Sequence, residues 1–322
     1  MQTVIKRKPI KRAAVLHDLC TVGKAAMTNI LPVLSVLGVE ACPVPTMVLS
    51  THTGGYGRPA VYPLSGFAGD CGKHLKEQGF SFDAVFVGYL GNEKNVREAY
   101  AFLDDFSSGP ILFDPIMADH GKFYSNFDES YNALLKGLIP RCTLMTPNYT
   151  ESCLLTGEPY EEVCTEDKLQ KIAAKLKKLG CKNAVITSIP LKGSLSAVGI
   201  LTEDRTEWFT YEPTGRAYPG TGDLFSAVLL GALLEDLPLE KAAGAAHRFV
   251  AHCIQKSDEA GYDTREGVLL EPELLELLKI VSKKKQKNDR YCNKGVDVYE
   301  QPKLQDRFFC GYFAAFPALY LQ

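Results

Sequence analysis

Short apolar runs alternate with amphipathic segments along most of this chain. Residues 84–87 and 184–187 form compact runs rich in valine, isoleucine and other apolar residues, as strands buried on both faces do. Residues 166–180 instead place Leu169, Ile172 and Leu176 on one stripe with lysines opposite, which is typical of an amphipathic helix. The chain therefore switches repeatedly between the two periodicities.

This alternation predicts an α/β fold. We expect strands near residues 13–16, 41–45, 84–88, 111–113, 143–146, 184–187, 197–201 and 207–211. We expect helices near residues 24–38, 65–79, 93–106, 128–139, 149–156, 166–180, 221–236, 239–257 and 271–285. Alternating strands and helices favour a three-layer α-β-α sandwich around a central, mostly parallel sheet.

The domain organisation follows from where this pattern stops. No linker divides the first part of the chain, so we predict one domain over residues 1–287. Residues 288–322 lose the periodicity and end in an aromatic run, and we treat them as a C-terminal extension of unknown role.

The amino-acid composition excludes several classes of protein. Hydrophobic residues make up 46% and charged residues 23% of the chain, as in globular proteins, and a net charge of −2 provides no basic field for nucleic acid. No run of about 18 apolar residues predicts a membrane-spanning helix. The ten cysteines include no Cys-x-x-Cys pair and no zinc-ligand spacing, which favours a reducing, cytoplasmic location.

The most informative stretch begins at residue 219. Gly220, Thr221, Gly222 and Asp223 lead into an almost wholly apolar helix, which must be buried because it has no polar face. Its first amides would therefore point into an enclosed site and could bind an anion. A carboxylate beside such amides suits the handling of a hydroxyl proton during phosphoryl transfer. The alternative is that Asp223 or Thr221 only caps the helix.

Polar residues also follow most of the other predicted strands. Each has a structural alternative: Asn148 and Glu151 have the spacing of a capping box, and His52 could be a satisfied loop histidine. Taken together, Asp119, Asn148 and Glu151 supply the oxygen ligands that Mg²⁺ prefers. The hydroxyls of Thr187 and Ser188 would face phosphate oxygens.

With these motifs in their order, the chain resembles the pyridoxal/pyridoxamine kinase family of the ribokinase-like superfamily. The resemblance covers about residues 12–280. It rests on Gly220 to Asp223 together with the segments 50–55, 88–89, 114–119 and 146–151.

The resemblance implies an ATP-dependent kinase that phosphorylates the 5′-hydroxymethyl group of pyridoxal, pyridoxamine or pyridoxine, in the salvage of vitamin B6. Asp223 would activate that hydroxyl, while the amides of Gly220, Thr221 and Gly222 stabilise the transferred phosphoryl group. The nucleotide and Mg²⁺ would be held by Asp119, Tyr124, Thr146, Asn148, Glu151, Thr187 and Ser188, with Asp119 and Glu151 on the metal. The substrate would be contacted by Asp18, His52, Thr53 and Tyr89. Residues 54–62 would cover the site.

The resemblance further implies a homodimer whose partners are otherwise ATP and a B6 vitamer, and it leaves a requirement for K⁺ open. One departure is Asp18, where many members have serine, so ring recognition could differ here. Two alternatives remain: a hydroxymethylpyrimidine kinase of the same superfamily, and a non-catalytic B6-binding protein. The loops carrying Thr53 and Tyr89 favour the pyridoxal group.

Overall fold

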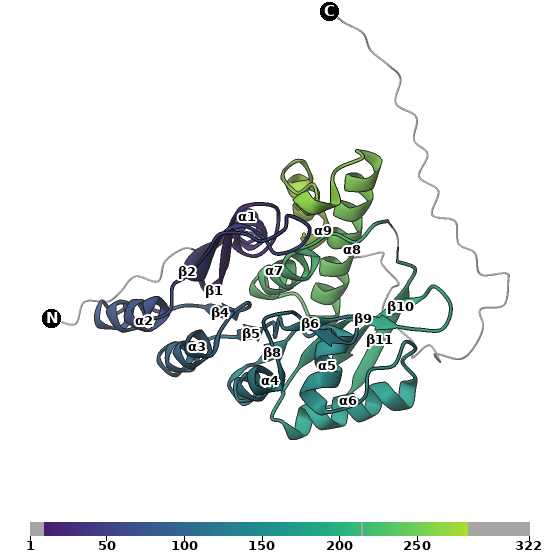
Figure 1. Cartoon of the computed structure of the whole chain (residues 1–322), viewed down its shortest axis with the longest axis horizontal. Coiled ribbons are helices and arrows are strands. Elements are labelled where there is room, and N and C mark those ends of the chain that lie inside the picture. Colours follow the sequence, from purple (N-terminus) through teal and green to yellow (C-terminus); the bar gives the residue numbers. More distant parts are fainter. Residues whose placement is uncertain (1–9, 214, 283–322) are drawn as a thin grey trace, which may run out of the picture.

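The computed structural model describes residues 10–213 and 215–282 and contains one central nine-stranded sheet (Figure 1). The strand order is β11-β10-β9-β8-β5-β4-β1-β2-β3. Neighbouring strands from β2 to β9 run parallel, while β3, β10 and β11 pair antiparallel at the two edges. The predicted mostly parallel sheet is confirmed. The strands are β1 (Lys11–Val22), β2 (Val39–Thr51), β3 (Val61–Pro63), β4 (Ala84–Val87), β5 (Ile111–Phe113), β8 (Leu144–Met145), β9 (Ala184–Pro190), β10 (Ser196–Leu201) and β11 (Thr206–Tyr211).

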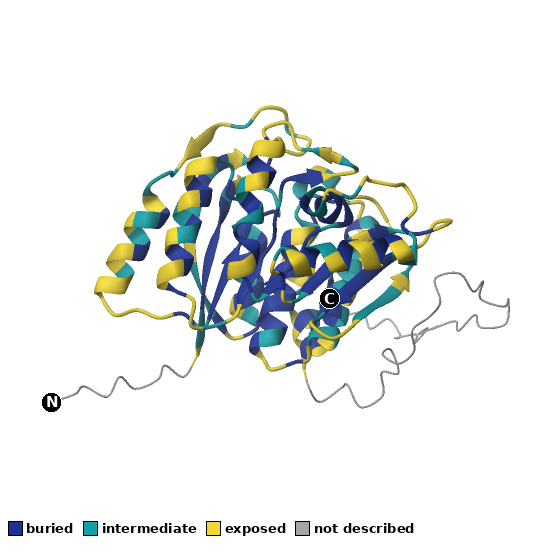
Figure 2. Cartoon of the chain, turned by 90° about the horizontal axis from the view of Figure 1, so that it is seen from below, coloured by how far each residue is buried: buried dark blue, intermediate teal, exposed yellow. Residues whose placement is uncertain are grey.

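Helices cover both faces of the sheet, which confirms the three-layer sandwich. Each face buries its own hydrophobic cluster, because side chains of successive strand residues point to opposite sides. One layer holds α2 (Phe67–Glu77), α3 (Glu93–Asp105), α4 (Glu129–Lys136), α5 (Tyr149–Thr156) and α6 (Glu166–Lys178). The other holds α1 (Met27–Val36), α7 (Thr221–Leu234), α8 (Leu239–Glu259) and α9 (Leu274–Val281). Figure 2 shows the helices buried toward the sheet and exposed on their outer sides.

Helix α7 is the most deeply buried helix of the second layer. Every residue from Asp223 to Ala232 is buried, and the helix packs against both α1 and α8. This agrees with its sequence, which has no polar face. The approach to α1 is close, since a Cβ on Gly231 would lie 2.3 Å from Leu37 Cδ1.

Several strands differ from the sequence prediction. Strand β2 was predicted at 41–45 and spans Val39–Thr51. Strand β1 continues past residue 16 to Val22, because β2 provides backbone partners along that length and the polar side chains do not interrupt the ladder. Strand β3 was not predicted, nor was the short hairpin of β6 (Ala118–Asp119) and β7 (Lys122–Phe123). These short strands are largely exposed, so they lack the buried apolar run by which the equally short β5 and β8 were predicted.

The C-terminal predictions are tested only in part. Helix α9 ends at Val281, and the boundary at residue 287 and the extension 288–322 lie outside the described residues. Within the described part of the chain, no helix has the length and apolar character needed to cross a membrane. The eight cysteines described there are free, and most of them are buried.

The contact of α7 with α1 predicts opposite effects for two helical glycines. Gly231→Ala should destabilise the protein by about 1–3 kcal/mol, because the new methyl overlaps the buried Leu37. Gly244→Ala in α8 is the matched control, because its Cβ would meet only the end of the flexible, exposed Arg248. It should stabilise the protein by up to about 1 kcal/mol through helix propensity. Equal unfolding free energies for both variants in denaturant titrations would contradict this packing.

Candidate active site

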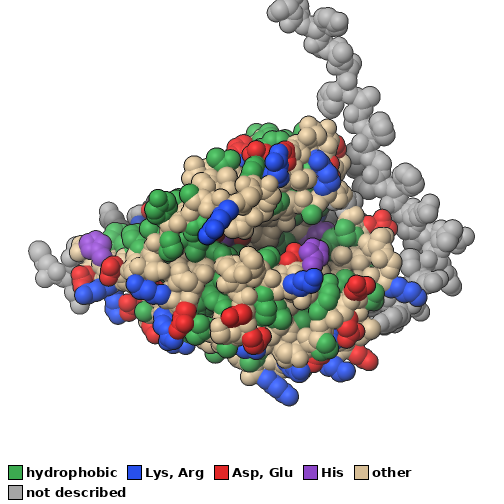
Figure 3. Space-filling model, viewed as in Figure 1, with side chains coloured by type: hydrophobic (Ala, Val, Ile, Leu, Met, Phe, Trp, Pro, Cys, Tyr) green, Lys and Arg blue, Asp and Glu red, His purple; other side chains and the backbone are tan. Residues whose placement is uncertain are grey.

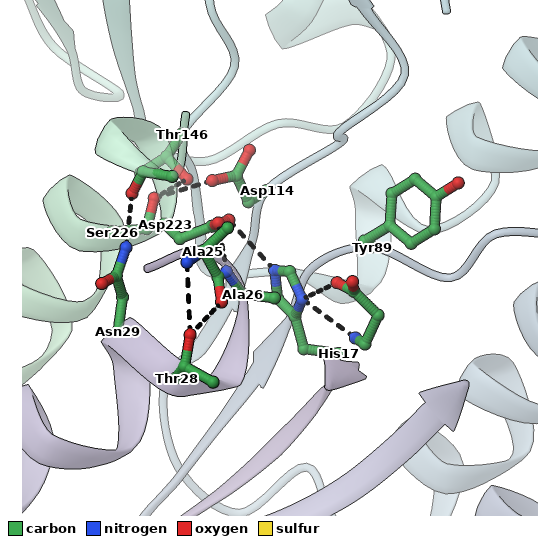
Figure 4. A network of polar contacts seen from close by, with 12 residues as sticks. His17, Ala25, Ala26, Thr28, Asn29, Tyr89, Asp114, Thr146, Asp223 and Ser226 are labelled. Atoms are coloured by element: carbon green, nitrogen blue, oxygen red, sulfur yellow. Dashed lines mark hydrogen bonds and ion pairs between the residues drawn. The ribbon is translucent and has the colours of Figure 1, made fainter. Parts of the chain in front are cut away.

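Polar groups from four segments meet near the ends of the central parallel strands, beside the start of α7. Strand β1 contributes His17 and Asp18, the ends of β5 and β8 contribute Asp114 and Thr146, and α7 contributes Asp223. Figure 4 shows His17, Asp114, Thr146 and Asp223 gathered around one region, and Figure 3 shows the surface hollowed near the middle of the molecule. Ligands of open α/β sheets bind at this edge.

The start of α7 is shaped by Gly220. This residue has φ 77°, and a Cβ there would lie 2.2 Å from the carbonyl oxygen of Lys24, so only glycine fits. Among the described residues, no side chain caps the helix, and the Thr221 hydroxyl donates to the carbonyl of Tyr218. The capping alternative for Asp223 and Thr221 is therefore excluded. No described atom lies within 4 Å of the position that a Cβ of Gly222 would take.

The Asp223 carboxylate makes contacts away from its own helix. Its Oδ2 accepts a 2.6 Å hydrogen bond from the amide of Ala26, and its Oδ1 lies 3.2 Å from His17 Nε2. Ala26 has φ 58° and ψ −139°, a conformation that an alanine adopts only under constraint. About a tenth of the Asp223 side chain is exposed, at 11%. The carboxylate is thus held from two sides and still reaches the hollow.

The loop that carries Ala26 is fixed by the first turn of α1. The buried Asn29 donates from Nδ2 to the carbonyls of Lys24, at 2.8 Å, and Gly220, at 2.9 Å. Thr28 Oγ1 lies 2.9 Å from the carbonyl oxygen of Gly23. Asn29 therefore ties the loop directly to the turn before α7, so the two amide-bearing segments keep their spacing.

His17 lies between two carboxylates. Its Nδ1 is 2.7 Å from Asp18 Oδ1, on the side opposite to Asp223, and the ring is 1% exposed. The register of β1 against β2 shifts between His17 and Leu19, a bulge that lets adjacent side chains reach the same region. Burial opposes protonation of the ring, but the charges of Asp223 and Asp18 outweigh it and raise the pKa of His17 to about 10.

A second buried carboxylate lies behind Asp223. Ser226 Oγ is 2.8 Å from both Asp114 Oδ2 and Thr146 Oγ1, which links α7 to the ends of β5 and β8. Burial, followed by the charge of Asp223, raises the pKa of Asp114 to about 7. Burial and the neighbouring carboxylate thus both disfavour the ionised form of Asp114.

The segments predicted to hold the nucleotide and metal surround the start of α5. Asn148 and Glu151 form the capping box that the sequence left as an alternative, and Glu151 Oε1 also accepts from the amide of Met117. Burial and the charge of Asp114 raise the pKa of Glu151 well above its usual value. Asp119 is nearly half exposed, at 47% of its side chain. The described residues contain no group of three or more histidine, cysteine, aspartate or glutamate side chains arranged to hold a metal by themselves.

The other predicted nucleotide residues lie along the same edge. Thr187 forms a parallel bridge with Asn148, and the next residue, Ser188, is exposed with φ 56°. Desolvation and the charges of Glu151 and Asp119 raise the pKa of Tyr124, which places its phenol near these carboxylates. The structure thus gathers this set, and its nucleotide role stays a prediction.

The residues predicted to contact the substrate differ in their position and exposure. Tyr89 lies apart from the Asp223 network in Figure 4, and its hydroxyl accepts from Asn126 Nδ2 at 2.8 Å. Thr53 is exposed on the loop after β2. His52 is buried, and its Nε2 lies 2.6 Å from the carbonyl of Arg265, while its Nδ1 accepts from the amide of Gly54. Both ring nitrogens therefore take backbone partners and hold the loop in place.

Several residues of this network were not among the predicted site residues. His17 and Asp114 are polar residues that directly follow the apolar runs 13–16 and 111–113, which is a signal that sequence analysis could use. Ser226 is a lone hydroxyl in an apolar helix and gives a weaker one. Ala26 gives no signal in the sequence, because an alanine does not predict an unusual backbone conformation.

Comparison with known proteins agrees with this geometry. The model of the phosphomethylpyrimidine kinase family matches residues 31–267. A Bacteroides thetaiotaomicron protein assigned as a phosphomethylpyrimidine kinase, solved in a crystal form with pyridoxal, is 32% identical with a TM-score of 0.79. That match covers 83% of this chain and 96% of the other.

Curated relatives fall into two substrate classes. A Schizosaccharomyces pombe protein assigned as a pyridoxal kinase is 29% identical over 206 residues, which are 61% of this chain and 56% of that protein. The hydroxymethylpyrimidine/phosphomethylpyrimidine kinase of Haemophilus influenzae is 29% identical over 181 residues, 54% of this chain and 66% of that protein. The matches span between half and two thirds of these two relatives.

The raised pKa of Asp114 predicts a pH-dependent stability. The folded protein binds this proton more tightly than the unfolded chain, so the charge of Asp114 costs stability as pH rises to about 7 and beyond. Asp114→Asn, which can still accept from Ser226, should therefore have a higher Tm than wild type at pH 8 and an equal Tm near pH 4. Asp204→Asn, in an exposed turn, should match wild type at both values. Thermal melts in which Asp114→Asn is less stable at pH 8 would contradict the assignment.

Proposed function

Because this chain belongs to the phosphomethylpyrimidine kinase family, we propose that it phosphorylates the 5′-hydroxymethyl group of a B6 vitamer with ATP. The family and fold make it a kinase of the phosphomethylpyrimidine and pyridoxal kinase group. The observation that carries the finer proposal is the position of Asp223, beside the uncapped start of a buried helix.

In the proposed reaction, Asp223 orients the substrate hydroxyl and accepts its proton. The hydroxyl oxygen bonds to the γ-phosphorus of ATP as the bond to the β-phosphate oxygen breaks, giving the phosphate ester and ADP. Phosphoryl transfer depends mainly on alignment and charge stabilisation, which suits a carboxylate fixed from two sides. The amides of Gly220, Thr221 and Gly222 lie where the helix dipole favours the negative phosphoryl oxygens.

A divalent cation fits the charge of this site. Burial and a neighbouring carboxylate raise the pKa of both Asp114 and Glu151, so a nearby cation would stabilise their ionised forms. Mg²⁺ is commonly held by one or two carboxylates together with substrate phosphates and water, so a three-carboxylate cluster is not required. We propose that Asp119 holds it directly and Glu151 through water, because Asp119 is exposed and both oxygens of Glu151 already accept amides. When bound, Mg²⁺ would neutralise charge on the phosphates.

The loop after β2 would cover the reaction. Its anchor is His52, whose ring contacts the carbonyl of Arg265 and fills the space beside Gly23. Residues 54–62 extend beyond this anchor and would exclude water that could otherwise receive the phosphoryl group. We place Asp18, Thr53 and Tyr89 at the ring of the substrate, with Tyr124, Thr146, Thr187 and Ser188 on the nucleotide side.

The relatives of this chain do not agree on a single class of substrate. The similar Bacteroides protein that was solved with pyridoxal supports a B6 vitamer. The Haemophilus relative supports hydroxymethylpyrimidine as the competing alcohol. A coupled kinase assay with ATP and Mg²⁺ on pyridoxal, pyridoxine, pyridoxamine and hydroxymethylpyrimidine separates the two. A kcat/KM higher for hydroxymethylpyrimidine than for every vitamer would reject the B6 assignment, and no turnover of any of them would reject the function.

Asp223→Asn tests the proton acceptor. The amide keeps the shape and a hydrogen-bonding group but accepts no proton, so kcat should fall by about 10²–10⁴-fold, the range of general base catalysis. Binding of ATP and pyridoxal, followed by calorimetry, should stay within a few-fold of wild type. Asp204→Asn is the control and should keep full turnover. Unchanged turnover in Asp223→Asn would rule out the proposed mechanism.

Two glycines at the start of α7 test the phosphoryl cradle separately from the fold. Gly222→Ala has room for its methyl, so its Tm should match wild type while kcat/KM for ATP falls, because the methyl occupies the space proposed for the phosphoryl group. Gly220→Ala should lose at least about 1–2 kcal/mol of stability, the cost of a left-handed alanine, and more from the overlap with Lys24. Melting curves and ATP kinetics together check both. A fully active Gly222→Ala would place the phosphoryl group elsewhere.

A further inference from the structure

We infer that His17 is a positioning residue, which fixes the orientation of the Asp223 carboxylate by an ion pair and couples it to Asp18 on the substrate side. The inference rests on the proposed function, in which Asp223 accepts the hydroxyl proton. No part of the family match includes His17, because that match begins at residue 31.

The geometry restrains both oxygens of Asp223. Oδ1 faces His17 Nε2 at 3.2 Å, and Oδ2 accepts from the amide of Ala26 at 2.6 Å. Rotation of the carboxylate would break both contacts at once. Removing either partner would leave one oxygen unrestrained, and a small misplacement of a reacting group costs rate steeply.

An imidazole is suited to this position because its two nitrogens point in opposite directions. Nδ1 meets Asp18 at 2.7 Å while Nε2 meets Asp223, so one rigid ring spans both carboxylates. The ring lies edge-on to Phe86, and a Cβ on Gly88 would lie 2.0 Å from His17 Cδ2. The space left by the surrounding residues therefore fits the imidazole ring, and a longer side chain would not fit there.

The surrounding charges keep the ring positive. Asp18 faces the ring from β1, Asp223 from α7 and Asp114 from the end of β5, while the Cys20 thiol contacts the Asp18 carboxylate. The attraction of Asp223 and Asp18 exceeds the burial cost and raises the pKa of His17 to about 10. His17 is then a cation over the whole neutral range, and its pairing with Asp223 is lost only as pH rises through that value.

A purely structural role for His17 is the competing explanation, so the test needs a readout that stability alone does not move. His17→Asn and His17→Gln each keep one hydrogen bond and lose the charge and the second contact. We expect kcat for the best vitamer to fall about 10- to 100-fold, as for a displaced reacting group, with KM for ATP and vitamer within about 3-fold of wild type. His252→Asn is the matched control, because it removes the histidine–carboxylate pair with Glu273, which lies between α8 and residues 271–273. It should keep the wild-type kcat.

The pH profile tests the charge of the ring. In wild type, kcat should fall with rising pH as His17 deprotonates, and in Asp18→Asn this fall should occur at lower pH, because the ring has lost one of its two carboxylates. Comparison at saturating vitamer removes the effect of Asp18 on binding. An unshifted alkaline limb, or a kcat within 2-fold of wild type in both His17 variants, would overturn the inference.

A measurement on the wild-type protein keeps the inference testable if the variants do not fold. The chain has six histidines, few enough for their imidazole signals to be followed by NMR across pH. At least one should remain protonated above pH 8 and should begin to titrate at lower pH in Asp223→Asn. If all six lose their protons below pH 8, the inference fails. Neither result depends on turnover, so a failure of the proposed kinase activity would be seen separately in the assay.

Discussion

The burial of α7 is the constraint on which the site depends. A helix without a polar face has to be enclosed by the sheet, α1 and α8, so its N-terminus opens inside the molecule and not at the outer surface. The amides of its first turn have no partners in a preceding turn and carry the positive end of the helix dipole. Any anion brought to this edge of the sheet therefore meets donors already in place. Gly220 makes the approach of the preceding chain possible, since Lys24 occupies the position that a side chain would need.

Charge is the second organising factor. Asp18, Asp114, Glu151 and Asp223 are all buried or nearly so, and concentrating carboxylates in this way is unfavourable without cations. Part of the imbalance is resolved within the chain, through His17. The rest is visible in the carboxyls of Asp114 and Glu151, which retain protons more strongly than in water. Under the proposed function, a divalent cation bound together with the nucleotide would offset the charge of the carboxylates and of the phosphates at the same time.

The α/β architecture could be predicted from the sequence because the period of the apolar residues indicates which side of each helix or strand is buried. The runs at 84–87 and 184–187 became central strands, and the stripe over 166–180 became α6. The same logic failed for β3 and the β6–β7 hairpin, where two or three residues are held by their partners and not by a pattern. In the site, Gly220 to Asp223 could be recognised because glycines and an acid before an apolar helix are an unusual combination. The contacts of Asp223 could not be, because Ala26 and His17 reach it from about 200 positions away in the chain, and only the folded backbone brings them together.

The contact between Lys24 and residues 266–267 has a consequence for the way the protein is made. The amide of Lys24 donates to the carbonyl of Glu266 at 2.7 Å, and Gly267 packs directly on the Lys24 backbone. The loop that aims the Ala26 amide is thus secured by residues that leave the ribosome some 240 positions later. During synthesis the residues of β1, β2 and β4 are complete long before that point, yet this contact of the loop can form only after residues 266–267 have been made. A nascent chain that lacks residues 266–267 therefore cannot yet hold the Ala26 loop through this contact.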